Sequence, residues 1–389
     1  FYKSSGEVLK SDELSIKSSV KRAREAIYGS DTGVFNKDGS LKQGAPLPVE
    51  VKAVGSVYLD RFTSVLSDKV FSGKQIIVYQ HSAVGRDLLV SLLEKLGANV
   101  IPVDRSNTFV SIDTENVTPS DQAYFKSLAK KYPDAFAIVS TDGDSDRPFV
   151  VDETGEFHRG DVVGYVVAKE LRADFAAVPV SSSDAVDRSR NEDSVTWQHT
   201  KIGSPYVIKS MQNSLQKGSK KPVGWEVNGG FLTGADIPYQ NGTLKALPTR
   251  DAFLPILLTL AAAVTQSVSV SDIFNKLPQR FTQAGLIDNY PQEDSASIIT
   301  TLAKNDTQAQ KIIEQCFSTE LGFGNPTDIN TTDGIRITFD TNEIAHIRPS
   351  GNAPQMRIYA TANSQKRADE IVMQGISENG ILRNLQSHI

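Results

Sequence analysis

Three aspartates that alternate with small residues form the stretch of the sequence with the clearest chemical meaning. Asp142, Asp144 and Asp146 stand in the run Thr-Asp-Gly-Asp-Ser-Asp-Arg, which ends at Arg147. Three carboxylates this close repel one another strongly unless a positive charge lies among them. Hard divalent cations take oxygen ligands, and the small residues in between let the loop curl so that alternate side chains converge. The spacing therefore predicts a metal site, with Arg147 offsetting the charge that the metal leaves over.

Two other interpretations of this acidic stretch compete with a metal site. One is a solvated acidic turn, which is a common feature, although three alternating aspartates entered from an apolar strand are not. The other is an EF-hand calcium loop, because Glu153 stands at the twelfth position counted from Asp142. However, Arg147 occupies the position where that loop requires glycine, and the flanking segments read as strands instead of helices. We therefore favour a divalent-metal loop between two strands.

A second stretch, from Arg348 to Arg357, combines the groups that hold phosphate. Two guanidinium groups flank Ser350, Gly351 and Asn352 in the run Arg-Pro-Ser-Gly-Asn-Ala-Pro-Gln-Met-Arg. Arginine is the side chain best shaped to hold phosphate through paired hydrogen bonds, and hydroxyl, amide and exposed backbone N–H groups complete such a cradle. An ordinary surface loop is an equally good interpretation of this stretch alone. The metal loop in the same chain favours phosphate.

Glu226 and Asn228 follow an apolar run that reads as a strand. Because they alternate, their side chains point the same way if the chain stays extended. A carboxylate beside an amide suits neighbouring sugar hydroxyls. A hairpin turn with a solvated glutamate is an equally good interpretation of this stretch alone.

Lys201 stands between a predicted strand and a predicted helix, in the run Thr-Lys-Ile-Gly-Ser. The lysine and the backbone amides at the start of that helix could meet an anion. A plain connector between strand and helix is the better interpretation when this run is considered alone.

The elements predicted around these residues place them at the ends of strands. A strand over 75–79, an amphipathic helix over 86–96 and a strand over 99–103 form a β-α-β unit, which implies parallel strands and a right-handed crossover. The apolar run 135–140 predicts the strand that leads into the aspartates. The metal loop is therefore expected at the carboxyl end of a strand, where α/β sheets place ligands. A second α/β series follows and ends in a long apolar helix over 250–264.

The pattern changes from about residue 275. The strands predicted there cover 281–287, 334–339, 343–347 and 355–362, and the helices cover 295–302, 308–317 and 365–373. A strand-rich segment closed by helices indicates a small α+β domain.

Composition sets the class of the protein. Of the 389 residues, 39% are apolar, which is ample for a core and indicates more than one domain. The net charge of −5 provides no global basic field to attract nucleic acid. No apolar run approaches the length of a membrane span, and the single cysteine, Cys316, excludes an internal disulfide and fits a reducing compartment. We expect a cytoplasmic protein with neither nucleic-acid nor membrane partners.

These stretches, in this order, resemble the α-D-phosphohexomutase family, which comprises phosphomannomutases and phosphoglucomutases. The resemblance spans nearly the whole chain and is most specific at Asp142 to Arg147, at Glu226 to Gly230, and at Arg348 to Gly351 with Arg357. It implies a multi-domain α/β fold, in which related three-layer α/β domains with mixed sheets and a C-terminal α+β domain surround a central cleft. The implied domains are 1–55 as the remainder of domain one, 56–158, 159–275 and 276–389.

The resemblance also implies a role for each candidate residue. Asp142, Asp144 and Asp146 would bind Mg²⁺ together with a phosphoserine, and Arg147 and Lys201 would serve catalysis. The implied substrate-binding residues are Glu226, Asn228 and Gly229 for the sugar, and Arg348, Ser350, Gly351, Asn352 and Arg357 for the phosphate that does not react. The family's Ser-His-Asn-Pro loop does not occur in these residues. We therefore expect the phosphoserine upstream of Phe1, and no turnover by these residues alone.

The reaction implied by the resemblance moves phosphate between O1 and O6 of a hexose, through a hexose 1,6-bisphosphate that turns round in the site. A monomer or homodimer would act on hexose 1-phosphate and hexose 6-phosphate. Ser204, Asn228 and the pair Asn352-Ala353 depart from commoner family residues, which leaves the choice of glucose or mannose open. Two alternatives are a non-catalytic protein that binds Ca²⁺ or sugar, and a metal-dependent sugar phosphatase, which would need a water-activating base near Asp142.

Overall fold

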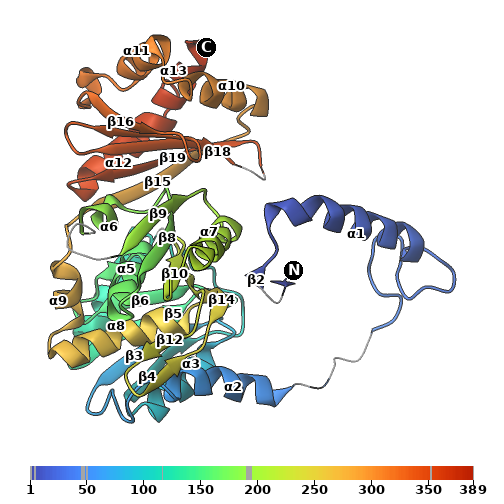
Figure 1. Cartoon of the computed structure of the whole chain (residues 1–389), viewed down its shortest axis with the longest axis vertical. Coiled ribbons are helices and arrows are strands. Elements are labelled where there is room, and N and C mark those ends of the chain that lie inside the picture. The colour runs from blue at the N-terminus through green and yellow to red at the C-terminus, as the bar shows by residue number, and fades with distance from the viewer. Residues whose placement is uncertain are drawn as a thin grey trace.

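The computed structural model describes residues 2–3, 6–44, 49, 51–115, 117–189, 195–350 and 353–388. Figure 1 shows an elongated body of successive sheets and helices, with helix α1 (Glu13–Ile27) standing to one side of it. No residue of α1 is buried. The short strands β1 (Tyr2–Lys3) and β2 (Gly6–Glu7) precede it, and β2 contacts the body at β14 and α7.

The first five-stranded sheet carries the aspartate loop. Its strand order is β4-β3-β5-β6-β7. The strands are β3 (Gln75–His81), β4 (Asn99–Arg105), β5 (Ala135–Thr141), β6 (Pro148–Asp152) and β7 (Phe157–His158), and the helices are α2 (Lys52–Thr63), α3 (Arg86–Lys95) and α4 (Pro119–Lys131). Strand β3 pairs in parallel with β4 and β5, which confirms the predicted β-α-β unit, whereas β6 and β7 are antiparallel. The aspartate loop therefore leaves the carboxyl edge of parallel strands, where α/β sheets bind ligands.

The second sheet has the order β14-β11-β10-β8-β9, with β10, β8 and β9 parallel and β11 and β14 antiparallel. Its strands are β8 (Phe175–Pro179), β9 (Thr196–Thr200), β10 (Pro222–Trp225), β11 (Phe231–Thr233) and β14 (Leu247–Asp251), and a small hairpin joins β12 (Ile237–Tyr239) to β13 (Gly242–Leu244). The helices are α5 (Gly160–Glu170), α6 (Asp184–Ser189), α7 (Ser204–Gln216), α8 (Phe253–Gln266) and α9 (Val270–Asn275).

Helix α8 lies at the centre of a core that these two sheets share. Every residue of α8 from Phe253 to Ala263 is buried, and the helix contacts both α5 and β6. One continuous cluster of buried side chains runs from Leu59 to Phe274 through both sheets. The prediction of a helix from residue 250 was wrong at its start, because Arg250 lies on β14. The helix begins later since the Asp251 side chain accepts hydrogen bonds from the backbone N–H groups of Phe253 and Leu254.

The C-terminal unit has its own sheet and core. Its strand order is β15-β19-β18-β17-β16, and all pairs are antiparallel. The strands are β15 (Phe281–Asp288), β16 (Pro326–Asn330), β17 (Ile335–Phe339), β18 (Ile344–Pro349) and β19 (Gln355–Ala362), and the helices are α10 (Gln292–Leu302), α11 (Thr307–Cys316), α12 (Gln365–Ile376) and α13 (Ile381–Ser387). Its buried cluster is separate from the one around α8. Figure 1 shows this unit at one end of the body, beyond β9 and α6.

Among the described residues, no helix is both long enough and apolar enough to cross a membrane.

Candidate active site

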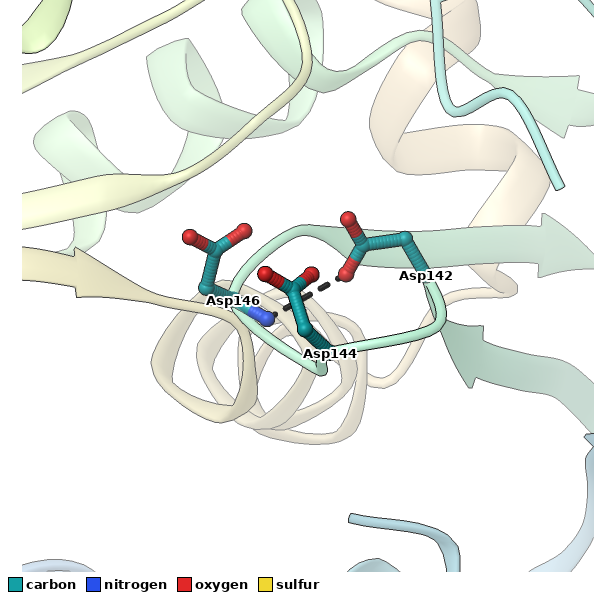
Figure 2. A group of neighbouring side chains, drawn as sticks. All are labelled: Asp142, Asp144 and Asp146. Atoms are coloured by element: carbon teal, nitrogen blue, oxygen red, sulfur yellow. Dashed lines mark hydrogen bonds between the residues drawn. The ribbon is translucent and has the colours of Figure 1, made fainter. Parts of the chain in front are cut away.

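The predicted metal ligands converge in the loop between β5 and β6. Asp142, Asp144 and Asp146 each present a carboxylate oxygen, and these oxygens lie within 4.8 Å of one another. The loop is held in shape by Asp142, whose Oδ1 accepts hydrogen bonds from the backbone N–H groups of Asp146 and Arg147 at 3.2 Å. Figure 2 shows the three side chains on one side of the loop and the bond from Asp142 to the Asp146 backbone. The curled loop that the small residues predicted is therefore present.

Electrostatics in this loop favour a bound cation. Burial, reinforced by the charges of Asp144 and Asp146, raises the pKa of Asp142 to about 6. Burial also raises the pKa of Asp146, against the opposing effect of Arg250. A divalent ion with oxygen ligands would reverse both penalties, because it offers each carboxylate a partner of opposite charge. The donor set of carboxylate oxygens fits a hard cation.

The geometry excludes the EF-hand interpretation of this stretch. The carboxylate of Glu153 is bound by the backbone N–H and the hydroxyl of Ser271, so it is held by α9 instead of by the aspartates. The loop is flanked by strands β5 and β6, where an EF-hand has helices.

Arg147 lies beside the aspartates, as the sequence predicted. Its Nε is 3.6 Å from Asp142 Oδ2 and 3.6 Å from Asp146 Oδ1. Its side chain is 36% exposed, so its charge reaches both the loop and the solvent next to it.

Arg250 joins the metal loop to the predicted sugar loop. Its Nε is 2.8 Å from Asp146 Oδ2, and its Nη1 is 3.5 Å from Glu226 Oε2. From the sequence, Arg250 and Asp251 resemble family positions, but no chemical role was predicted for Arg250, which was expected at the start of a helix. An arginine directly before the capping residue Asp251 was the available signal.

The predicted sugar loop, residues 226–230, is a tight turn, so the extended chain that would point Glu226 and Asn228 the same way is not present. Strand β10 ends at Trp225, and the backbone N–H of Gly229 donates to the Glu226 carbonyl at 2.9 Å. Gly229 has a φ of +85°, which a residue with a Cβ rarely adopts. The alternative interpretation, a hairpin turn, placed Glu226 in solvent, but Glu226 is buried. Burial raises the pKa of Glu226 against the opposing charges of Arg250 and Arg147. Asn228 is also buried, and its side-chain oxygen accepts a hydrogen bond from the Gly230 backbone N–H at 3.1 Å.

A small cavity meets this loop where the two α/β sheets and the C-terminal unit come together. Its volume is about 60 Å³, which leaves room for roughly four water molecules. All three regions contribute lining residues to this cavity, among them Glu115, Arg159, Ile202, Glu226, Asn228 and Tyr359. Arg159 and Tyr359 were not singled out from the sequence, because nothing in their local patterns distinguishes them from structural residues.

The two arginines of the predicted phosphate loop face each other across strands. Arg348 on β18 and Arg357 on β19 are direct cross-strand partners. Like charges directly opposite in an antiparallel pair are destabilising. The Nε atoms of both are buried and have no hydrogen-bond partner among the described residues. An anion placed between them would relieve both conditions.

The remaining predicted site residues are those of the phosphate loop beside its arginines, and Lys201. Ser350 follows β18, and its backbone N–H donates to the Gln355 carbonyl at 2.9 Å. Gly351 and Asn352 lie outside the described residues. Lys201 is exposed at the end of β9, and it lines a groove along α7 instead of the cavity beside Glu226.

Comparison with known proteins places the chain in a family. The family model described as phosphoglucomutase/phosphomannomutase, alpha/beta/alpha domain II, matches residues 56–155, and the model of domain III matches residues 159–281. A phosphomannomutase of Salmonella muenchen is 36% identical over 392 residues, which cover 100% of this chain and 74% of that protein. The chain belongs to the phosphoglucomutase/phosphomannomutase family.

Other relatives agree with this family assignment. A phosphomannomutase of Sinorhizobium fredii is 36% identical over 82% of this chain and 65% of its own length. The crystal structure of a phosphoglucomutase/phosphomannomutase family protein from Burkholderia thailandensis has the same fold, with a TM-score of 0.63 at 17% identity over 96% of this chain and 70% of that one. The chain thus spans roughly two thirds to three quarters of these family members. The resemblance of the sequence to the α-D-phosphohexomutases is confirmed, as is the multi-domain mixed α/β fold.

Proposed function

We propose that this chain is the metal-, sugar- and phosphate-binding part of a phosphohexomutase. The reaction transfers a phosphoryl group between O1 and O6 of a hexose, mannose or glucose, through a phosphoserine and a hexose 1,6-bisphosphate. The cofactor is Mg²⁺, held by Asp142, Asp144 and Asp146. The phosphoserine stays a prediction that rests on the sequence resemblance.

The observation that carries the proposal is that two residues lining one cavity, Glu226 and Ile202, each belong to a chain of contacts that leads to a predicted binding group. On one wall, Glu226 is joined through Arg250 to Asp146 of the metal loop. Ile202, which also lines the cavity, donates its backbone N–H to Asp333, whose carboxylate pairs with Arg348. These contacts link the aspartate loop and Arg348 to residues that line one cavity, which supports a site that holds both ends of one sugar.

The residues of this chain supply position and charge for the transfer. Phosphoryl transfer depends on alignment and charge neutralisation more than on covalent help from side chains. Mg²⁺ on the three aspartates would neutralise charge on the transferring phosphoryl group. Arg147 would add a second positive charge beside it, and Arg250 holds the Glu226 carboxylate in place to accept hydrogen bonds from sugar hydroxyls.

The phosphate clamp would hold the end of the sugar that does not react. Arg348 and Arg357 suit this role because each can bind a phosphate through paired N–H groups. After the first transfer, the bisphosphate must turn round so that its other phosphate reaches the serine. A single clamp then has to accept a phosphate on either end of the hexose.

The cavity also implies that the C-terminal unit moves. A volume of about 60 Å³ is far below the roughly 300–1,000 Å³ of ordinary ligand pockets. A hexose phosphate can enter only when the unit that carries Tyr359 and Arg348 swings away from Glu226. The separate core of that unit permits such motion, because few buried contacts would break.

The test is a coupled assay of the full-length protein with glucose 1-phosphate and mannose 1-phosphate side by side, with Mg²⁺ and a trace of glucose 1,6-bisphosphate. We expect conversion to the 6-phosphate, lost in Asp144→Ala. Release of inorganic phosphate without isomerisation would instead indicate a phosphatase. A protein that binds Ca²⁺ more tightly than Mg²⁺ and turns over neither sugar would contradict the proposal in favour of a binding protein.

A further inference from the structure

Asp333 is a carboxylate that connects the phosphate clamp to the neighbouring sheet. Its Oδ2 accepts a hydrogen bond at 2.9 Å from the backbone N–H of Ile202, a cavity-lining residue that follows β9. Its Oδ1 lies 3.7 Å from Nε of Arg348. The two oxygens of one side chain therefore serve two different regions, one on each side of the boundary between the C-terminal unit and the rest of the body.

The structure around Asp333 fixes its position. Its backbone carbonyl is 2.6 Å from Nε2 of the buried His346. Gly334, the next residue, has a φ of +74°, and a Cβ on it would lie 2.2 Å from the Ile347 carbonyl oxygen. The turn before β17 is thus packed directly against the strand that carries Arg348. Asp333 cannot easily move away from the clamp.

The contact with Arg348 is an ion pair without a hydrogen bond. At 3.7 Å the Nε–H of Arg348 is not bonded to the carboxylate, and that Nε is buried without a hydrogen-bond partner among the described residues. Asp333 therefore offsets part of the charge on Arg348 while leaving its N–H groups for a ligand. A phosphate that binds Arg348 must come close to this carboxylate, and like charges weaken binding.

We propose that Asp333 is a positioning residue with two effects, which rest on the proposed phosphohexomutase function. Its bond to Ile202 holds the C-terminal unit closed over the cavity. Its negative charge weakens the phosphate clamp, so that a bisphosphate can leave Arg348 and turn round between the two transfers. The clamp is thereby kept loose enough for a substrate that must bind in two orientations.

Two substitutions separate these effects. Asp333→Asn keeps an oxygen that can accept the Ile202 N–H but removes the charge beside Arg348. Asp333→Ala removes both. The matched control is Asp328→Asn, which removes the same charge from an exposed position on β16 of the same sheet.

Inorganic phosphate serves as the probe, with calorimetric titration at fixed ionic strength. We expect Asp333→Asn to bind phosphate at least about threefold more tightly than the unchanged protein, because a nearby carboxylate no longer competes with the anion. Asp328→Asn should bind it as the unchanged protein does. A defect in folding would weaken binding, so tighter binding cannot come from a merely structural role. Equal or weaker binding by Asp333→Asn would overturn the charge effect.

Solution scattering tests the tether. We expect a larger radius of gyration for Asp333→Ala, and an unchanged one for Asp333→Asn and Asp328→Asn. Equal radii for all variants would overturn the tether. Neither experiment needs turnover, so a protein that shows both effects but isomerises no hexose phosphate would contradict only the proposed function. In an active protein, Asp333→Asn should lower KM and kcat together, because release and reorientation become slower.

Discussion

Asp142, Asp144 and Asp146 show how the site is built at the scale of single residues. They gather negative charge in one loop, as Arg348 and Arg357 gather positive charge on one pair of strands. Each group is unfavourable by itself, since like charges repel. Each would become favourable with the ligand proposed for it, a cation in the first case and a phosphate in the second. Binding energy in such a site is partly the relief of repulsion that the folded chain maintains.

At this scale, Asp144→Asn should strongly weaken metal binding. Loss of one of three converging carboxylates should weaken Mn²⁺, used as a spectroscopic probe for Mg²⁺, by more than about 100-fold, since even outer partners of a metal ligand contribute 10–100-fold. Electron paramagnetic resonance titration measures it. Asp134→Asn, an exposed carboxylate directly before the other end of β5, is the control. Retention of full Mn²⁺ affinity by Asp144→Asn would contradict the assignment of the loop.

His346 predicts a dependence of stability on pH. Burial lowers its pKa from the usual 6.5 to about 4, against the opposing effects of the hydrogen bond to the Asp333 carbonyl and of the Asp333 charge. Between these values the unfolded chain binds the proton and the folded chain does not. The stabilisation is therefore complete above pH 6.5 and is lost as the pH falls toward 4, by up to about 3 kcal/mol.

Urea unfolding at pH 7.5 and at pH 5 checks this sign. His346→Gln removes the titrating group but keeps a donor for the Asp333 carbonyl, so it should lose less stability on acidification than the unchanged protein. An identical loss in both proteins would mean that other groups cause the pH dependence.

At the scale of elements, the sugar loop takes its shape from helix α5. A Cβ added at Gly160, the first residue of α5, would lie 2.2 Å from the backbone N of Gly229. Further along the helix, a Cβ at Gly164 would lie 2.4 Å from Trp225, the last residue of β10. The two glycines let the helix approach both ends of the strand-to-turn segment. The position of Glu226 therefore depends on a neighbouring element as much as on its own loop.

Gly160→Ala should both destabilise the fold and weaken sugar-phosphate binding. Overpacking of this kind costs about 1–3 kcal/mol, and the displaced turn should also raise the Kd for glucose 1-phosphate. Gly55→Ala is the matched control, because Gly55 lies within helix α2 and its new Cβ would meet only Leu88 at an ordinary 3.7 Å. That control should gain about 0.5–1 kcal/mol from helix propensity. Urea unfolding measures the change in the free energy of unfolding for each variant. Equal changes in Gly160→Ala and Gly55→Ala would refute the packing argument.

At the scale of the whole molecule, a cluster of charged and polar side chains joins the C-terminal unit to the rest of the body. Arg280, whose side chain is 2% exposed, binds Asp184 Oδ1 at 2.7 Å and also donates to Asn342 and Asn363. Arg188 binds the other oxygen of Asp184 at 2.7 Å and donates to Asn342 at 3.1 Å. The Asp184 carboxylate thus contributes a contact between the two separately packed cores, in addition to that of Asp333 with Ile202.

Asp184→Asn should loosen this boundary. Removing one partner of a buried ion pair costs about 3–5 kcal/mol, because the other charge stays buried without compensation. Since the two cores are separate, differential scanning calorimetry should resolve two unfolding transitions more widely spaced than in the unchanged protein. Lys366→Gln, which breaks an exposed ion pair with Glu370 on α12, should change neither. Unfolding transitions in Asp184→Asn that match those of the unchanged protein would show that the cluster does not hold the unit.

The sequence by itself determined what depends on neighbours along the chain. The alternation of Asp142, Asp144 and Asp146 with small residues was enough to predict a loop with converging carboxylates, and apolar periodicity was enough to predict β3, α3, β4 and β5. Spacing also brought Arg348 and Arg357 into one stretch. The local geometry of the backbone restricts the conformations open to such patterns, so the folded chain keeps nearly the same local structure that the sequence predicts.

Only the tertiary structure decided how these stretches meet. It placed Arg250 on a strand between Asp146 and Glu226, and set Asp333 between Ile202 and Arg348. These contacts join residues far apart in the sequence, and they exist because α8 binds two sheets into one core while the C-terminal unit folds around another. The packing of whole elements, which no local pattern encodes, selects the partners of each charge.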